Sequence, residues 1–392
     1  MIQKNHMPEK EAFDWKKVSV ISWGHFSHDV FSSFLPPLLP LLIEKFSLSY
    51  ALAGFLSVAQ RLPSLLNPLV GIMADRGWFR WMVISAPALT TICMSALGVA
   101  PSFILLVLLL LVAGISSTFF HVPGPVLVRQ VSGDRIGKGM SYFMVGGELA
   151  RTVGPILALA AVSWWTLEGI YRLAPVGIFS SVLLYMQLRR VTLTTIPGKT
   201  VLSHLHMTRR LRSFFMLIAG ILFFRAFIKT ALTLFLPTLL IEQGKSLWFG
   251  GSALAVLQLA GAVGTFFAGT FSDKLGRKTI LMSVTLSTPI FSFLFLFTNG
   301  IFRFIALVFL GFVLLSSGPV LLALIQDVRT DSPSFLNGIY MTLNFIISSG
   351  MALIVGGLAD AFGLYRTFIV CSLLAVLAFP FIFMLKDTDQ TH

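Results

Sequence analysis

Long stretches without a single charged side chain limit the fold of this chain more than any other feature. Residues 103–112 and 304–315 are two such stretches. Of the 392 residues, 56% are hydrophobic and only 11% are charged, whereas soluble domains carry about a quarter charged residues. Lipid is the solvent that tolerates such a surface, and about 20 apolar residues are enough for a helix to cross a bilayer. We therefore predict an all-α integral membrane protein.

The apolar stretches between polar breaks predict twelve transmembrane helices. The first six cover 18–43, 51–74, 81–98, 102–127, 139–161 and 168–188, and the second six cover 213–241, 248–271, 279–297, 303–326, 335–358 and 365–385. This pattern divides the chain into a tail (1–17), an N-terminal six-helix bundle (18–188), a basic linker (189–212), a C-terminal six-helix bundle (213–386) and a second tail (387–392).

The distribution of basic residues predicts the orientation of the chain. Of the 29 Lys and Arg residues, 20 fall on one set of tails and loops, and only Lys45, Arg172, Lys245, Arg303 and Arg366 fall on the opposite loops. Lys and Arg concentrate on cytoplasmic loops, so we expect both termini in the cytoplasm. The net charge of +13 is explained in this way, and nucleic acid is not expected as a partner.

The two halves of the chain repeat each other. Gly71 and Asp75 recur 198 residues later as Gly269 and Asp273, and the Gly-Pro-Val sequence at 124–126 recurs at 318–320. Repeats at half the chain length are typical of transporters built from two related bundles. We therefore expect two pseudo-symmetric bundles that alternate access to a central site.

Two related loops carry glycine, aspartate and basic residues, which we expect to form a cytoplasmic gate or loop motif. Glycine allows close helix approach, and aspartate can pair with a cation or a helix N-terminus. The residues are Gly71, Asp75 and Arg76 after the second span, and Gly269, Asp273, Gly276, Arg277 and Lys278 after the eighth. The second copy resembles the Gly-x-x-x-Asp-x-x-Gly-Arg-Lys signature of the major facilitator superfamily, which implies the twelve-helix major facilitator fold.

The first span carries His25 and Asp29 four residues apart, the fourth carries Phe-His at 120–121, and the fifth carries Gly-Gly at 146–147 before Gly-Pro at 154–155. Together these features resemble the fosmidomycin-resistance branch of drug exporters, which implies a bacterial inner (plasma) membrane location. That branch has a His and an Asp four residues apart in the first span, Phe-His-Pro-Glu in the fourth, and Gly-Gly before Gly-Pro in the fifth. The matching residues are His25, Asp29, His121, Gly146, Gly147, Gly154 and Pro155. The glycines and Pro155 are expected to serve helix packing. The chain departs from the pattern at 122–123, where Val-Pro replaces Pro-Glu.

Six charged residues lie inside the predicted spans and sum to +2: Asp29, Arg61, Glu148, Arg151, Arg225 and Lys229. Each is costly in hydrocarbon unless it is paired or hydrated, so each is a functional candidate. We expect Asp29, His25 and Glu148 to serve proton coupling, and Arg225, Lys229, His121, Arg61, Arg151 and His28 to contact substrate. Structural roles remain alternatives: Glu148 can pair with Arg151, and Asp29 with Arg61.

The leading functional hypothesis is secondary active transport, with proton-coupled efflux (antiport) of a small anionic or amphipathic compound such as an antibiotic or a metabolite. The alternative is proton-coupled import of an anionic metabolite or a siderophore. A remote third hypothesis is a membrane enzyme with a metal bound by His25, His28 and Asp29. We predict no enzymatic activity, no cofactor, no metal and a monomer whose partners are protons, the lipid bilayer and the substrate. No ATP-binding loop of the Gly-x-x-x-x-Gly-Lys type is present.

Overall fold

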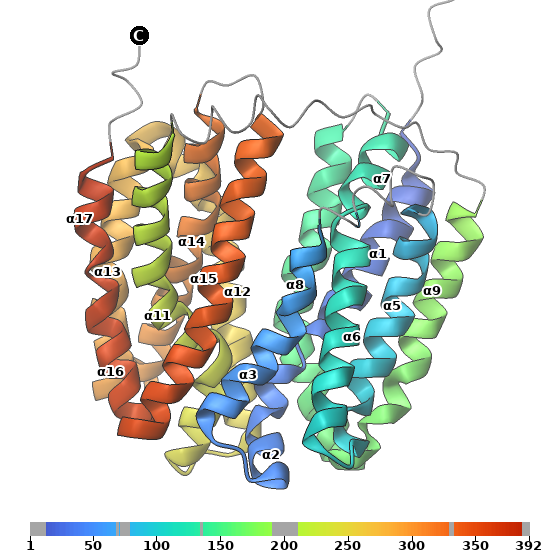
Figure 1. Ribbon diagram of the computed structural model, residues 1–392, viewed down its shortest axis with the longest axis horizontal. Helices are drawn as coiled ribbons and strands as arrows, with labels where there is room; N and C mark the ends of the chain where they lie inside the picture. Colours follow the sequence, from blue (N-terminus) through green and yellow to red (C-terminus); the bar gives the residue numbers. More distant parts are fainter. Residues whose placement is uncertain are drawn as a thin grey trace, which may run out of the picture.

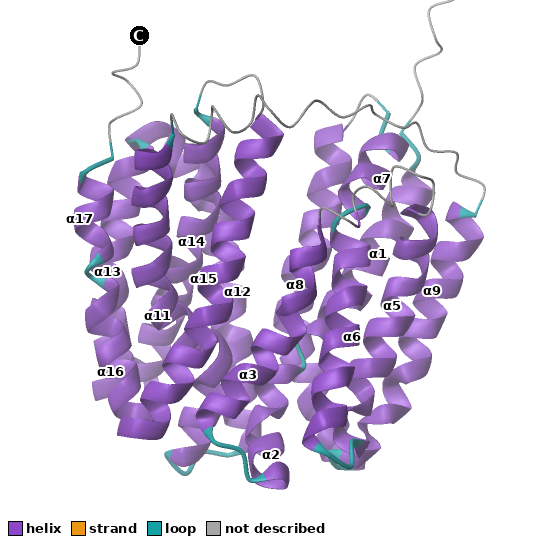
Figure 2. Ribbon diagram, viewed as in Figure 1, coloured by secondary structure: helices purple, strands orange, loops and turns teal. Residues whose placement is uncertain are grey.

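The computed structural model describes residues 13–67, 70, 79–133, 136–189, 211–328 and 333–385. Every regular element in these residues is a helix (Figure 2). The first half contains α1 (Trp15–Ser32), α2 (Leu35–Phe46), α3 (Tyr50–Arg61), η1 (Leu62–Leu66), α5 (Phe79–Ser95), η3 (Ala96–Val99), α6 (Phe103–His121), α7 (Gly124–Val131), α8 (Ile136–Trp165), η4 (Glu168–Leu173) and α9 (Ala174–Leu188). The second half contains α11 (Arg212–Glu242), α12 (Leu247–Leu275), α13 (Arg277–Phe297), α14 (Gly300–Gln326), α15 (Pro333–Phe362), α16 (Leu364–Ala375) and α17 (Ala378–Phe383).

Eleven segments of the described chain are long and apolar enough to cross a membrane. They correspond to the predicted spans except the second, which begins as α3 and η1 and is described only to residue 67 and at residue 70. Helices suit this setting because they satisfy their backbone hydrogen bonds internally. Eleven of the predicted spans are therefore helical, and the total of twelve stays a prediction.

Prolines break two spans that the sequence analysis treats as continuous. The first span is divided into α1 and α2 by a turn at 33–34, just before Pro36, and the fourth is divided into α6 and α7 around Pro123. Proline lacks the N–H that would bond the carbonyl four residues earlier. For Pro36 that carbonyl belongs to Ser32, and it accepts a hydrogen bond from Gln60 Nε2 at 2.9 Å instead.

The helices form two bundles side by side, one containing α1 to α9 and the other α11 to α17 (Figure 1). The start of α1 and the described C-terminal end lie at the same end of the molecule, here called the terminus side. On the outer surface, large apolar side chains such as Ile104, Phe266 and Phe302 are 72%, 79% and 69% exposed. Such exposure is the pattern expected of a surface that faces lipid rather than water.

The bundles are joined on the side opposite the termini. There the Asp360 carboxylate of α15 accepts hydrogen bonds from the backbone N–H groups of Tyr50 and Ala51, at 2.6 and 2.8 Å, and so caps the start of α3. A Cβ on Gly54 would collide with the carbonyl of Ala352, so glycine is what permits α3 and α15 to approach so closely.

The clusters of buried apolar side chains also show that the bundles are joined on one side only. The largest cluster of buried side chains combines residues of both bundles, for example Leu56 and Ala158 with Leu236 and Val355. Two smaller clusters each belong to one bundle: one contains residues 18–188 only and the other residues 215–385 only. The bundles therefore share one core on the side opposite the termini and have separate cores on the terminus side.

Candidate functional site

A cavity of about 300 Å³ lies between the two bundles. Both bundles contribute to it, mostly with polar side chains. The lining consists of Asp29, Ser32, Ser33, Leu35, Pro36, Ser57, Gln60, Arg61, His121 and Arg151 from the first half, and Thr233, Leu234 and Gln258 from the second. A polar cavity at the interface of two repeats is where transporters of this architecture bind their substrates.

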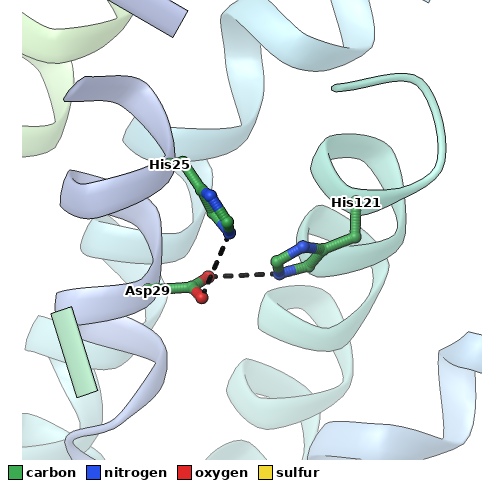
Figure 3. Close-up of side chains that lie close together, drawn as sticks. All are labelled: His25, Asp29 and His121. Atoms are coloured by element: carbon green, nitrogen blue, oxygen red, sulfur yellow. Dashed lines mark hydrogen bonds and ion pairs between the residues drawn. The ribbon is translucent and has the colours of Figure 1, made fainter. Parts of the chain in front are cut away.

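One wall of the cavity contains a carboxylate surrounded by three imidazoles. His28 Nδ1 lies 2.8 Å from Asp29 Oδ1. His121 Nε2 lies 3.1 Å from the same oxygen, and His25 Nε2 lies 3.3 Å from Oδ2 (Figure 3). Asp29, His25 and His28 are buried on α1, whereas His121, at the end of α6, is exposed toward the cavity. The partners of Asp29 among the described residues are therefore histidines, and the pairing with Arg61 considered above is not found there.

The hydrogen bonds of this cluster determine where its protons lie. His25 Nδ1 is 2.7 Å from the carbonyl oxygen of Phe143, so Nδ1 must carry the hydrogen. In a neutral ring, His25 Nε2 would then be an acceptor facing another acceptor, Asp29 Oδ2. His25 Nε2 is buried and has no hydrogen-bond partner among the described residues. Its 3.3 Å contact with Asp29 Oδ2 would become a hydrogen bond if a proton were added to the imidazole or to the carboxyl group.

Packing against α8 fixes the position of this cluster. The His25 ring stacks on Phe143 with ring centroids 4.0 Å apart, and the His28 ring stacks on Phe120 at 5.3 Å. A Cβ on Gly147 would lie 2.6 Å from His25 Cε1. Glycine at 147 therefore makes the room that the His25 ring occupies.

The other predicted packing residues lie along the same contact between α1 and α8. A Cβ on Gly146 would lie 2.7 Å from the carbonyl oxygen of Ser22, and one on Gly154 would collide with the Ser33 hydroxyl. Pro155 lies inside α8 directly after Gly154. These positions support the expectation that the glycines of the fifth span let two helices approach closely.

The ligand atoms of His25, Asp29 and His121 all lie within 4.8 Å of one another, close enough to share a metal ion. Asp29 nevertheless already pairs with both imidazoles in this arrangement. His28, which the metal-enzyme hypothesis also names, uses Nδ1 to bind Asp29 and has a buried Nε2 without a partner. The absence of a metal therefore stays a prediction.

A second group of charges lies at or near the same cavity. Glu148 Oε1 and Arg151 Nη1 form the expected ion pair on α8 at 3.0 Å. Arg61 lines the cavity at the end of α3. Lys229 of α11 lies within electrostatic range of Arg61, Arg151 and Glu148, and also of Arg225 on its own helix. Four of the charges predicted from the sequence are thus brought together from both halves.

Arg225 has a different environment from Lys229. It is buried inside the second bundle, where Nη2 donates a hydrogen bond to the carbonyl oxygen of Leu314 at 3.0 Å. Its neighbours at a small internal void include Thr285 and Thr288, and it does not line the central cavity. Arg225 therefore connects α11 to α14 and does not line the central cavity in this arrangement of the helices, and its contact with a substrate stays a prediction.

The loop motif is described only in its second copy. Gly71, Asp75 and Arg76 lie outside the described residues, and for Gly269 and Asp273 only the helical backbone of α12 is described. Gly276 has a φ of +86°, which favours glycine at the turn between α12 and α13. Arg277 Nε lies 3.1 Å from Asp327 Oδ2 beyond α14, and Lys278 Nζ donates to the carbonyl oxygen of Leu385 at 3.0 Å. The basic residues thus connect the turn to the ends of neighbouring helices.

Several polar residues of the cavity were not singled out from the sequence. Gln60 and Gln258 both line it, and they are separated by the same 198 residues that relate the two loop motifs. Thr233 also lines the cavity, and its hydroxyl donates to the carbonyl oxygen of Lys229. Comparing polar residues in equivalent spans of the repeat would have identified the two glutamines.

The fold and the central cavity together define a transporter of two related bundles. The chain belongs to the Major Facilitator Superfamily, whose family model matches residues 21–352. It is therefore a multi-pass membrane protein of a transporter family, with a small molecule as its expected cargo.

Individual relatives agree with this assignment. The chain is 25% identical over 385 residues to the fosmidomycin resistance protein of Escherichia coli (strain K12), a match that covers 96% of this chain and 93% of that protein. A bacterial homologue of the human lysosomal transporter Spinster, in an inward-facing and occupied conformation, has a TM-score of 0.79 at 15% identity, with 96% of each chain covered. A D-xylose–proton symporter has a TM-score of 0.75 at 15% identity, covering 96% of this chain and 99% of that one. These structural similarities concern the fold alone.

Proposed function

We propose that this protein exports a small anionic or amphipathic compound across the bacterial inner membrane, in exchange for protons, by alternating access. The observation that carries the proposal is the cavity shared by both bundles, which is lined by Asp29 and His121 together with the cations Arg61 and Arg151. The similarity to a fosmidomycin resistance protein supports export rather than import.

The proton would be held in the Asp29 cluster. The groups that face Asp29 are His25 and His28 on α1 and His121 on α6, and the same cavity also contains Arg61 of α3 and Arg151 of α8 with its partner Glu148. Because His121 is open to the cavity, water there can deliver a proton to Asp29 or remove one. Loss of that proton leaves an unneutralised buried charge, which changes the relative free energy of the two conformations.

Transport into everted membrane vesicles tests this function. With the vesicle interior acidified, we expect anionic antibiotics or metabolites of a candidate panel to accumulate inside, and accumulation should stop when a protonophore collapses the gradient. Flux that is independent of the pH gradient would contradict proton coupling, and accumulation driven only by the opposite gradient would favour the importer of an anionic metabolite or siderophore.

Two variants separate the role of the cluster from general damage. Asp29→Asn removes the charge that holds the proton, so gradient-driven accumulation should be lost while substrate exchange without a gradient continues. Asp14→Asn is the matched control, because Asp14 pairs with Lys17 at the start of α1 and lies outside the cavity. Equal losses in both variants would count against a specific role of Asp29.

A further inference from the structure

Two cations of the central site have no partner for their side chains among the described residues. Arg61 ends α3 in the first bundle, and Lys229 lies in the middle of α11 in the second. Both side chains are exposed to water and yet lie deep within the protein, as groups that line an internal cavity do. Arg61 lines the cavity directly, and Lys229 is one helical turn from Thr233, which also lines it.

The neighbouring charges do not neutralise this pair. Lys229 is within electrostatic range of three arginines and one carboxylate, namely Arg61, Arg225, Arg151 and Glu148. Glu148 is already paired with Arg151 at 3.0 Å. Arg225 is held by the Leu314 carbonyl away from the cavity. Arg61 and Lys229, one on each bundle, therefore remain without a carboxylate partner among the described residues at the centre of the molecule.

We propose that one anionic group of the substrate binds between Arg61 and Lys229 and acts as the counter-ion that allows the two bundles to approach each other on the terminus side. This proposal rests on the proposed function and assigns the position of the anion within the cavity. The ligand class is an oxyanion that carries two negative charges, since it must balance one guanidinium and one ammonium group. Arg61 offers a planar fork that matches such an oxyanion, and Lys229 offers a compact charge that adjusts to it.

The architecture gives this bridge a mechanical effect. The bundles share one core on the side opposite the termini and have separate cores on the terminus side, so closure of the terminus side has to bring the two bundles together around the cavity. Without an anion, closure presses like charges together in surroundings of low polarity, which is unfavourable. With an anion bound, the same movement shortens two favourable contacts. Substrate binding thus favours closure.

Distance measurements on spin-labelled protein test this inference. Labels at Met144→Cys on α8 and Met216→Cys on α11 report the separation of the bundles on the terminus side, in protein whose native Cys93 and Cys371 are replaced by alanine. Both methionines are exposed. Inorganic phosphate is the probe, and chloride at equal ionic strength is the control. We expect phosphate, but not chloride, to shorten the distance in a saturable way.

Variants of the two cations identify the bridge. Arg61→Gln and Lys229→Gln should each require about tenfold more phosphate for half-maximal closure, as expected for loss of one charge-assisted contact. Arg366→Gln is the matched control, because Arg366 is exposed on the side opposite the termini. Lys229→Glu places a carboxylate opposite Arg61 and should close the terminus side without phosphate.

The outcomes separate this inference from the proposed function. No effect of phosphate in the parent protein, or equal responses in the two glutamine variants and the parent protein, would overturn the counter-ion bridge. Failure of Lys229→Glu to close the terminus side would overturn it as well, in protein that elutes as a folded species. The measurement uses no pH gradient, so proton-coupled export can fail while the bridge stands, and the reverse also holds.

Discussion

The Asp360 cap on α3 should stabilise the conformation described here, because it is a contact between bundles that exists only while they are joined on the side opposite the termini. Its carboxylate accepts two backbone hydrogen bonds, from Tyr50 and Ala51 at 2.6 and 2.8 Å. Replacement of a helix-capping acid by alanine costs about 0.5–2 kcal/mol. Asp360 is exposed, so water screens part of this energy, and we expect Asp360→Ala to weaken the joined state by about 1 kcal/mol, or about fivefold in the conformational equilibrium.

The whole of this energy acts on the equilibrium, since the alternative conformation separates the capped helix from its cap. Spin labels at Thr166→Cys and Asn299→Cys, on loops of the two bundles at this side, would report the separated population. Glu168→Gln is the matched control: Glu168 also lies on this side, but its partner Lys45 belongs to the same bundle. An unchanged distance distribution in Asp360→Ala, or an equal change in Glu168→Gln, would refute the reasoning.

Two further predictions concern the Asp29 cluster and the loop motif. Gly147→Ala should displace the His25 ring, because the new Cβ would lie 2.6 Å from it, and should reduce pH-driven transport at least about tenfold. Gly350→Ala is the control: its Cβ would meet no atom within 4 Å, so this variant should transport normally. Normal transport by Gly147→Ala would show that the position of the His25 ring is unimportant. Arg277→Gln should lower the thermal unfolding temperature by loss of its contacts with Asp327 and Ser272, an effect of about 1 kcal/mol. The effect should be smaller in an Asp327→Asn background, where the contact with Asp327 is already weakened; fully additive losses in the double variant would show that the two residues act independently.

The sequence predicts the helices well because their determinants are local. Charge-free stretches of membrane length give the spans, and the repeat gives the division into two bundles. The breaks at Pro36 and Pro123 were also readable in principle, because a proline removes a backbone donor wherever it occurs. What the sequence does not reveal is that Gln60, 24 residues after Pro36, satisfies the carbonyl that this proline leaves free.

The candidate site is less predictable, because it depends on which face of each helix meets the cavity. Asp29 and His121 were both identified, but their direct contact depends on how α1 packs against α6. Arg225 and Lys229 are four residues apart on one helix and have the same sequence signal. They nevertheless differ in surroundings, because Arg225 is buried against α14 whereas Lys229 is exposed. Such differences arise from tertiary packing and are absent from the pattern of a single span.

Within the described part of the chain, the side chains that bind Asp29 all belong to the first bundle. A rocking movement of one bundle against the other can therefore leave these bonds intact, because it moves donors and acceptor together. In the proposed cycle Asp29 and its three histidines would move together as one rigid unit. Only the compartment whose water reaches His121 would change. Fast proton exchange would then need no rearrangement of bonds within this unit, and the turnover rate would be set by the movement of the bundles.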